Sequence, residues 1–543
     1  MKRNFTRLLL SAVLMMCCTQ LFAAVGDTFK DDDFTYKITS EDDHTVEVAQ
    51  NYSAKYSGRV YIEDNVQYNN TTYSVTSIGE QGFWGADLEE VVIPASITSI
   101  GYRAFKECRY LTVIEFTDNS QLKTIGESAF EYCKGLHSLE IPASVTSIGK
   151  SAFEFCDFLT DVTFAYGSQL ETIGENAFYK CKNLHSLAIP TSVSAIGKSA
   201  FESCEFLTDV TFADGSQPET IGENTFYNCK NLHSLVIPAS VTSIGKSAFY
   251  GCTNLTSVTF ADGSQLTTIG KSAFSNCSGL TSVTIPSGVT AIGERAFNNC
   301  QMLTSITIPQ KVNLINDYTF WNCKGLTAVT FADGSQLTTI GESAFSNCSG
   351  LTSVTIPSSV TTINEYAFEN CEGLKFVEFK GNTNISGTYV FSNCGTNGWL
   401  VNLILPDNWT GSTPVDDNFW YKGLFKSYRP SEYKQAALDA ITAAMGEYKN
   451  STYLQGLVAT EINAINATTD IATITTQKDA AIAKTQAVVA AYPSIIAEGV
   501  EKGKAEAFGE LGTEKTGTAV KVTKDDKEII LYAPDKVEYI ITK

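Results

Sequence analysis

Cysteine is the reactive residue whose spacing stands out in this chain of 543 residues. Thirteen of the fifteen cysteines follow one another at intervals of 23 or 25 residues. Thiols could form disulfides, hold a metal or fill a core. An odd number, with one equivalent site per interval, favours stacked and buried thiols, with a disulfide framework as the alternative. No Cys-x-x-Cys pair supports metal binding. The positions are Cys108, Cys133, Cys156, Cys181, Cys204, Cys229, Cys252, Cys277, Cys300, Cys323, Cys348, Cys371 and Cys394.

Histidine and aspartate also recur, at a longer interval. His137, His185 and His233 lie 48 residues apart in the phrase Leu-His-Ser-Leu, and Asp161 and Asp209 recur with the same interval. Both sets are explained if a segment of 48 residues, which spans two of the cysteine intervals, has been duplicated. The imidazoles would then lie about 10 Å apart, which is too far to share a metal ion. The acidic run at 31–33 lacks the glycine and distal glutamate of a calcium loop, so we interpret it as a solvated turn and predict no metal or cofactor.

Catalytic motifs are missing from the sequence. It contains no Gly-x-Ser-x-Gly, no His-Glu-x-x-His and no phosphate-binding loop. Its carboxylates are distributed over a repeating frame, whereas an active site needs polar groups that converge. The formal charge is -20 and no Lys/Arg-rich run occurs, so nucleic acid and anionic membranes are poor partners. The sequence therefore predicts a protein that is not an enzyme.

Each interval contains one recognisable strand. Between Leu280 and Pro286, Val283 and Ile285 alternate with Ser282 and Thr284, which predicts a half-buried strand ended by the proline. The apolar residues that follow have the spacing of neither a strand nor a long helix, so we expect an irregular return arm or a short helical turn. They are Val289, Ile292, Ala296, Phe297 and Cys300.

The 25-residue intervals differ from the 23-residue ones at one place. In them Ile-Pro is replaced by Phe-Ala-Asp-Gly-Ser-Gln, as at 260–265, which predicts a turn at Asp262 and Gly263. A fixed period of this length predicts a solenoid, because one unit cannot bury its apolar face without neighbours. We expect equivalent residues to stack at about 5 Å.

The repeated unit L-x-x-V-x-I-P-x-x-V-x-x-I-G-x-x-A-F-x-x-C is clear from Leu351 to Cys371, where Asn364 takes the glycine position. It resembles the BspA-like class of leucine-rich repeats, and the opening segments at 26–29, 36–38 and 73–79 resemble the start of those proteins. The resemblance covers about residues 25–410. It implies a right-handed coil, an exported bacterial protein and, for some members, adhesion to host matrix proteins or to other bacteria. It carries over no catalytic residue.

The outward residues of the strands are the candidate binding face, which leucine-rich repeats present as a concave sheet. Hydroxyl groups dominate it. Because threonine is favoured in strands, a soluble strand-forming surface is the simpler interpretation, and a hydrogen-bonding array for a protein or glycoprotein is the functional one. The candidate residues are Ser138, Asp161, Ser186, Asp209, Ser234, Ser257, Thr259, Ser282, Thr284, Ser305, Thr307, Ser353 and Thr355.

The first residues predict an export signal. Lys2, Arg3 and Arg7 precede an apolar stretch, and small residues follow at Ala23 and Ala24. Lipid attachment at 17–18 is less favoured, because the preceding residues lack small side chains. We expect a secreted or cell-surface protein without a transmembrane span. The first functional hypothesis is an adhesin that binds an extracellular protein or glycoprotein. The alternative is a structural surface-layer or matrix protein that self-associates and has no soluble ligand.

The predicted fold is an α+β repeat solenoid with a parallel sheet, followed by a small helical bundle and a β-hairpin. In the bundle we expect helices from Ser431, at 452–466 and at 471–491, with Pro493 ending the third and a further helix at 494–511. Strands are expected at 520–523, 528–532 and 537–541. The expected segments are a signal peptide at 1–24, an N-terminal β cap at 25–75, about fourteen coils at 76–410, a cap or linker at 411–430, the Ala-rich bundle at 431–512 and the hairpin tail at 513–543.

Overall fold

The fold comes from a computed structural model. It describes residues 24–31, 34–51, 56–385, 387–395, 401–406, 409, 425–428, 430–446, 452–468, 471–505, 518–524, 527–533 and 539–542. Most of the expected signal peptide, both cysteines within it, Asp32, Asp33 and most of the expected linker lie outside these residues. The chain forms two units. The first contains Met1–Leu374, Thr383–Trp399 and Ser412–Trp420, and the second contains Lys375–Asn382, Leu400–Gly411 and Tyr421–Lys543.

A small set of strands covers the N-terminal end of the first unit. Strands β1 (Thr28–Asp31), β2 (Phe34–Ser40) and β3 (Thr45–Ala49) are antiparallel, and β5 (Asn65–Tyr68) is antiparallel to β6 (Thr71–Ile78). Strand β3 pairs in parallel with β6, and β6 with β8, which is the first short strand of the repeats. Strand β4 (Ser57–Tyr61) pairs with β7 (Asp87–Ile93). The antiparallel edge thus closes the apolar end of the stack.

Every coil contributes to a first ladder of mostly four-residue strands. Neighbours in this ladder are parallel, as in β11 beside β13. The predicted parallel sheet is therefore confirmed. The strands after β7 are β9 (Val113–Phe116), β11 (Ser138–Ile141), β13 (Asp161–Phe164), β15 (Ser186–Ile189), β17 (Asp209–Phe212), β19 (Ser234–Ile237), β21 (Ser257–Phe260), β23 (Ser282–Val283), β25 (Ser305–Ile308), β27 (Ala328–Phe331) and β29 (Ser353–Ile356).

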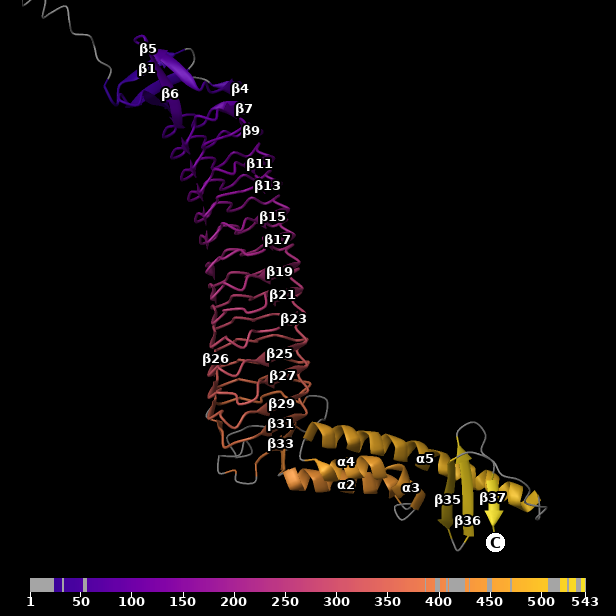
Figure 1. The fold of residues 1–543 in the computed structure, drawn as a ribbon. Helices are drawn as coiled ribbons and strands as arrows, with labels where there is room; N and C mark the ends of the chain where they lie inside the picture. Colours follow the sequence, from indigo (N-terminus) through magenta and orange to yellow (C-terminus); the bar gives the residue numbers. More distant parts are fainter. Residues whose placement is uncertain are drawn as a thin grey trace, which may run out of the picture. The chain divides into compact units, whose positions relative to one another are not determined.

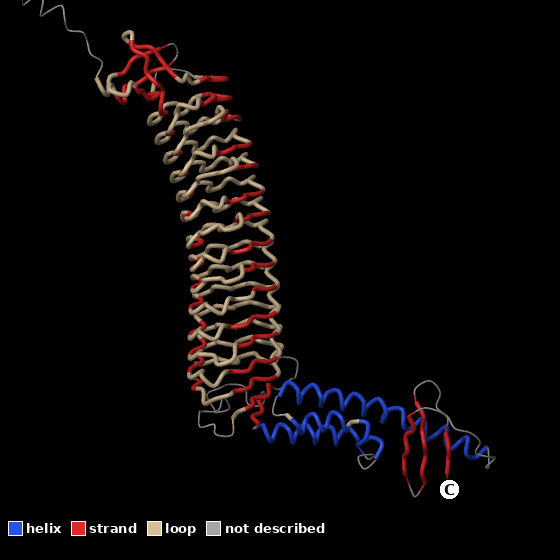
Figure 2. The backbone as a smooth tube through the Cα atoms, viewed as in Figure 1, coloured by secondary structure: helices blue, strands red, loops and turns tan. Residues whose placement is uncertain are grey.

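The return arm carries a second parallel ladder, of two-residue strands, on the opposite side of each coil (Figures 1 and 2). The expectation of an irregular arm or helical turn missed it, because two residues are too short for a periodicity signal. The strands are β8 (Ser99–Ile100), β10 (Thr124–Ile125), β12 (Ser147–Ile148), β14 (Thr172–Ile173), β16 (Ala195–Ile196), β18 (Thr220–Ile221), β20 (Ser243–Ile244), β22 (Thr268–Ile269), β24 (Ala291–Ile292), β26 (Leu314–Ile315), β28 (Thr339–Ile340), β30 (Thr362–Ile363) and β32 (Asn384–Ile385).

Identical side chains stack inside the coils. One phenylalanine per coil, from Phe83 to Phe391, forms a continuous column with ring centroids 5.0 to 5.6 Å apart. That spacing matches the separation of parallel strands, so each ring lies flat on its copy in the next coil. Leucine, isoleucine and alanine columns beside it are equally buried. The interior is therefore nearly the same at every level of the array.

The thirteen cysteines form another buried column, and none is in a disulfide. Each Sγ–H donates to the carbonyl of a phenylalanine in the preceding coil, as from Cys133 to Phe105 at 3.1 Å and from Cys348 to Phe320 at 3.2 Å. Burial raises the pKa of the Cys108 thiol to about 12. The thiols are thus small apolar spacers whose one donor is satisfied.

Each phenylalanine turn contains a residue in the left-handed region just before the cysteine, and the choice of residue differs along the array. Asn276, Asn299 and Asn322 occupy this position with φ of 60° each. Asparagine tolerates this conformation better than most side chains. The Asn299 amide donates to Asn276 at 2.7 Å and accepts from Asn322 at 2.6 Å, so the turns are also joined by a ladder of side-chain amides.

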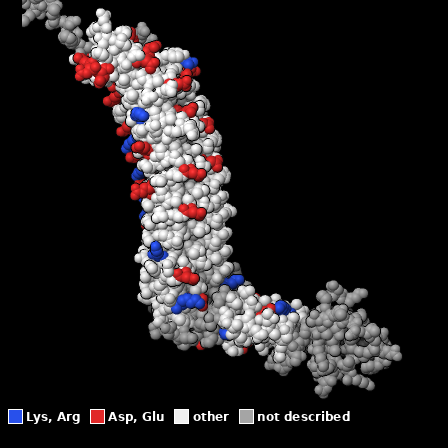
Figure 3. Space-filling view, in the orientation of Figure 1, with Lys and Arg blue, Asp and Glu red and all other residues white. Residues whose placement is uncertain are grey.

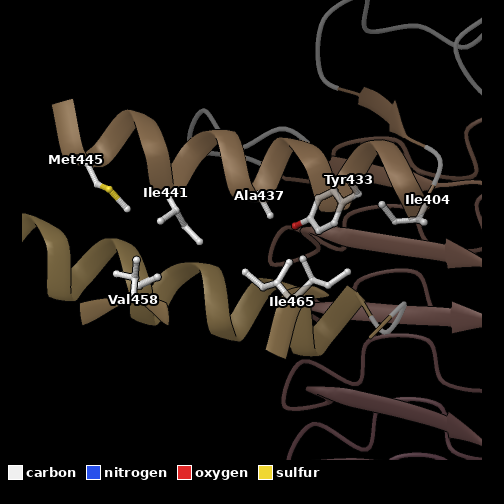
Figure 4. Packing of buried hydrophobic residues seen from close by; sticks show 9 residues of the cluster. Ile404, Tyr433, Ala437, Ile441, Met445, Val458 and Ile465 are labelled. Atoms are coloured by element: carbon white, nitrogen blue, oxygen red, sulfur yellow. The ribbon is translucent and has the colours of Figure 1, made fainter. Parts of the chain in front are cut away.

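In its described residues the second unit has strands, four helices and a three-stranded sheet. The strands are β31 (Phe376–Phe379), β33 (Val401–Ile404) and β34 (Phe425–Tyr428), and the helices are α2 (Pro430–Met445), α3 (Thr452–Leu457), α4 (Ala459–Ala467) and α5 (Ile471–Ala505). Its core joins Tyr433, Ala437, Ile441 and Met445, which lie four residues apart on one face of α2, to Ile465 of α4 (Figure 4).

Two expectations for the helices were wrong. The segment 452–466 forms two helices, because Val458 between them has φ -105° and ψ 4°. Pro493 does not end the third helix, which continues to Ala505. Proline removes one backbone donor and costs about 3 kcal/mol relative to alanine within a helix, and α5 continues through it all the same. The C-terminal sheet has the expected order, with β35 (Thr518–Lys524), β36 (Lys527–Ala533) and β37 (Tyr539–Thr542) antiparallel.

Candidate binding surface

We call the outward side of strands β9 to β29 the strand face. Its side chains alternate with buried ones, so that Ser234 and Val236 are exposed while Leu235 and Ile237 are buried. The structure places all thirteen candidate residues here, exposed except for the half-buried Ser257, and Thr284 lies just beyond the end of β23. They are Ser138, Asp161, Ser186, Asp209, Ser234, Ser257, Thr259, Ser282, Thr284, Ser305, Thr307, Ser353 and Thr355.

The curvature of the array differs from the expectation. In the view of Figure 1 the repeats bend slightly, and the four-residue strands lie along the outer side of the bend. The strand face is therefore not the concave surface that we expected. The second ladder gives the physical reason, because strands on both sides of a coil impose the same spacing of about 4.8 Å and leave no wide outer layer to force a horseshoe.

Acidic groups that form no ion pair among the described residues mark the N-terminal part of the strand face. Asp161 and Asp209 each accept a hydrogen bond of 2.7 Å from the preceding threonine and form no ion pair within the described part of the chain. Exposed Glu140 is likewise outside every ion pair there. Figure 3 shows more Asp and Glu than Lys and Arg on the visible side of these coils. From β21 to β29 no outward strand residue is charged.

Exposed apolar side chains gather beside the same strands, and sequence reasoning missed them. Tyr110, Phe158 and Phe206 are 63%, 54% and 49% exposed and precede the leucine that leads into each strand. Met302 takes the same position further along and is also exposed. The 48-residue interval between the three aromatic residues is the signal that could have found them.

The histidines lie next to these rings. The His137 ring is 6.1 Å from Phe158, and the His185 ring is 6.4 Å from Phe206. Because the histidines lie on alternate coils, they do not converge. No group of three or more His, Cys, Asp or Glu among the described residues could hold a metal ion.

A shallow hollow interrupts the strand face in the middle of the array. It has a volume of about 630 Å³ and is lined by 257–265 and by residues near Ser282 and Pro286. The hydrogen-bonded ladder that starts at β11 ends here at β23, and the next one starts at β25. The break falls where two 23-residue intervals, Cys277 to Cys300 and Cys300 to Cys323, follow each other. The lining offers hydroxyls, Asp262 and Gln265, and no nucleophile paired with a base.

Comparison with known proteins identifies the repeat. The model of the BspA type leucine rich repeat region (6 copies) matches residues 76–208, 166–280, 219–350 and 267–398. These matches cover more than half of the chain, so the protein belongs to this family. Repeats of this kind are generally binding scaffolds and not enzymes. No curated protein matches the sequence.

Several solved structures are similar to this chain, and the first of them shares its fold. A leucine-rich repeat protein from Bacteroides ovatus is 27% identical, with a TM-score of 0.52 over 74% of this chain and 99% of that one. A leucine rich cell surface protein from Faecalibacterium prausnitzii is 26% identical, with a TM-score of 0.42 over 72% of this chain and 97% of that one. The pneumococcal vaccine antigen PcpA is 19% identical, with a TM-score of 0.45 over 74% and 97%. No described helix is both long and apolar enough for a membrane span.

Proposed function

We propose that this protein is exported to the bacterial cell surface or beyond it, where the strand face binds an extracellular protein or glycoprotein. The expected signal at 1–24 supports export. The observation that carries the binding role is the concentration of exposed apolar side chains on and beside the strand face, where the core does not need them. Val113 and Val236 point outward from strands of the strand face, and Tyr61 points outward from β4. The aromatic residues that precede the leucine before each strand lie beside them. Exposed apolar groups among polar ones are typical of interaction surfaces.

The position of these side chains favours binding over a purely structural surface. A solenoid needs only a soluble outer surface, which serine and threonine supply. An exposed ring costs solubility, and where Phe158 and Phe206 contact the preceding coil they contact an exposed histidine and not the core. In the coils from Cys229 onwards, the residue just before the leucine that leads into the strand is Asn or Gly in most cases. The fold therefore does not require an aromatic residue at this entrance position.

The test compares substitutions on the two sides of the coils in the full exported chain. Immobilised extracellular-matrix and serum glycoproteins should bind the protein saturably, and the triple variant Y110S/F158S/F206S should lose this binding. The control L314S/Y389S removes exposed apolar groups from the return arm and should bind normally. All variants should unfold at similar temperatures. Equal losses in both variants, or concentration-dependent self-association that no soluble protein competes with, would contradict the proposal.

A further inference from the structure

The N-terminal part of the strand face contains one cluster twice. Phe158 and Asp161 lie on one coil with His137 on the coil before, and Phe206 and Asp209 repeat the arrangement with His185. The two copies are 48 residues apart in every member. The next repeat keeps His233 but has Asn254 and Ser257 in place of the ring and the acid. The array therefore presents two complete clusters.

In each cluster the aspartate carboxylate forms no ion pair within the described residues, so it can pair with a cation of a partner. The lysines at the same edge are already in ion pairs, since Lys134 and Lys182 lie 3.3 and 3.7 Å from Asp157, and Lys230 lies 3.2 Å from Glu205. Among the described residues, the carboxylates of Asp161 and Asp209 each contact only a threonine hydroxyl. An exposed carboxylate beside an aromatic ring suits a Lys or Arg side chain, which can form a charge-assisted hydrogen bond and contact the ring face. The net charge of -20 attracts a basic partner.

The ladder fixes the distance between the clusters. Asp161 pairs with Ser186, and Ser186 pairs with Asp209, so the two carboxylates are two strand spacings apart. Two spacings are about 10 Å. One turn of a polyproline II helix rises about 9.3 Å over three residues, and its side chains at i and i+3 lie on one side. In a β-strand, residues i and i+2 on one side are only about 6.7 Å apart.

We infer that the two clusters bind cationic side chains three residues apart in an extended, basic polypeptide segment. This inference rests on the proposed binding role of the strand face and specifies its partner. Each cluster receives one cation between its carboxylate and its ring. The absence of the acid and the ring at Asn254 and Ser257 limits the site to two cations.

The experiment titrates the full chain with three labelled proline-rich peptides of equal length. The first has arginines at i and i+3, the second has them at i and i+2, and the third has glutamates at i and i+3. We expect the first to bind at least fivefold tighter than the second, and the third not to bind. The variant D161N/D209N should bind the first peptide at least tenfold more weakly than the parent. Its control, E171Q/E219Q, removes two exposed acids with the same 48-residue spacing beside the other ladder and should stay within twofold of the parent.

Equal affinity for the first two peptides would overturn the inferred spacing. Equal losses of affinity in D161N/D209N and E171Q/E219Q would show that binding depends on net charge and not on the two clusters, which would also overturn the inference. Preference for the acidic peptide would overturn the cationic partner. If a matrix glycoprotein binds the D161N/D209N variant as well as the parent, the inference fails while the proposed function stands. If Y110S/F158S/F206S binds that glycoprotein normally, the proposed function fails as well.

Discussion

The N-terminal and C-terminal parts of the strand face, β9 to β19 and β21 to β29, have the same interior and different surfaces. Phenylalanine and cysteine columns run through both parts without interruption. Outside, the first part presents Asp161, Asp209 and exposed rings, and the second presents almost only serine and threonine. The interior therefore determines the coil, and the residues at the outward positions can vary without disturbing it.

The turns differ between the two parts as well. Asparagines link the C-terminal turns through their amides, whereas Tyr132 stacks on Phe155 at 4.6 Å in the corresponding N-terminal turns. Both devices join one coil to the next. The comparison therefore predicts that substitutions in the interior have large and equal effects in the two parts, and that substitutions outside have smaller and unequal ones.

The largest effect should come from alkaline pH acting on the cysteine column in both parts at once. Burial raises the pKa of eleven of these thiols, and that of Cys323 to about 12. In the unfolded chain a thiol ionises near pH 8.5. Stability is therefore complete below about pH 8.5 and decreases as pH rises towards the folded values. From pH 8 to 10 the free energy of unfolding should fall by an amount on the order of 1 to 2 kcal/mol for each thiol whose pKa burial raises.

Chemical denaturation at several pH values measures this loss, and a thiol reagent locates its source. Native protein at pH 8 should react at almost none of the thirteen buried cysteines, and unfolded protein at all of them. Rapid labelling of native protein, or an unfolding free energy that does not change between pH 8 and 10, would show that the column is open to water in at least one part.

Sequence alone predicted the interior well because the interior is what repeats. The interval between cysteines located the coils, and the alternation around Val283 located the first ladder. The second ladder was missed because Thr268 and Ile269 are too few residues to form a pattern. The aromatic entrance positions were missed because Phe158 precedes the repeated leucine and looks like ordinary variation within a turn. No neighbour requires an exposed residue in a turn, so the trace it left in the sequence was the 48-residue interval that Phe158 shares with Tyr110 and Phe206.

A large and local effect should follow from truncating the phenylalanine column. Phe201 and Phe345 are fully buried, and each lies between two rings at 5.2 to 5.6 Å. F201A and F345A should each lower the free energy of unfolding by about 3 to 5 kcal/mol. Because the interior is shared, the two losses should agree to within about 1 kcal/mol in urea titrations. A loss confined to one variant would show that the two parts are packed differently.

A moderate and unequal effect is expected at the turns. N299A removes three side-chain amide hydrogen bonds, with Asn276, Gln301 and Asn322, and places alanine in the left-handed region, which should cost about 2 kcal/mol. Ser203 holds the equivalent N-terminal position with φ 61°. S203A should cost less than about 0.5 kcal/mol, because a small side chain in the same conformation replaces another and no ladder is cut. Thermal unfolding of both variants checks this, and equal losses would remove the distinction between the turns.

The smallest effect on stability should come from the strand face, where the two parts differ most in proposed function. The Thr208 hydroxyl donates to Asp209 at 2.7 Å and lies 3.0 Å from the His185 carbonyl, so it keeps an acceptor when Asp209 loses its charge. D209N and S353A should therefore each change the free energy of unfolding by less than about 0.5 kcal/mol. Only D209N should weaken the binding of the basic peptide with cations at i and i+3, because Ser353 lies in the part of the strand face without outward charges. A loss of more than 1 kcal/mol in D209N would assign this carboxylate to the scaffold, and the contrast between the two surfaces would then reflect folding instead of binding.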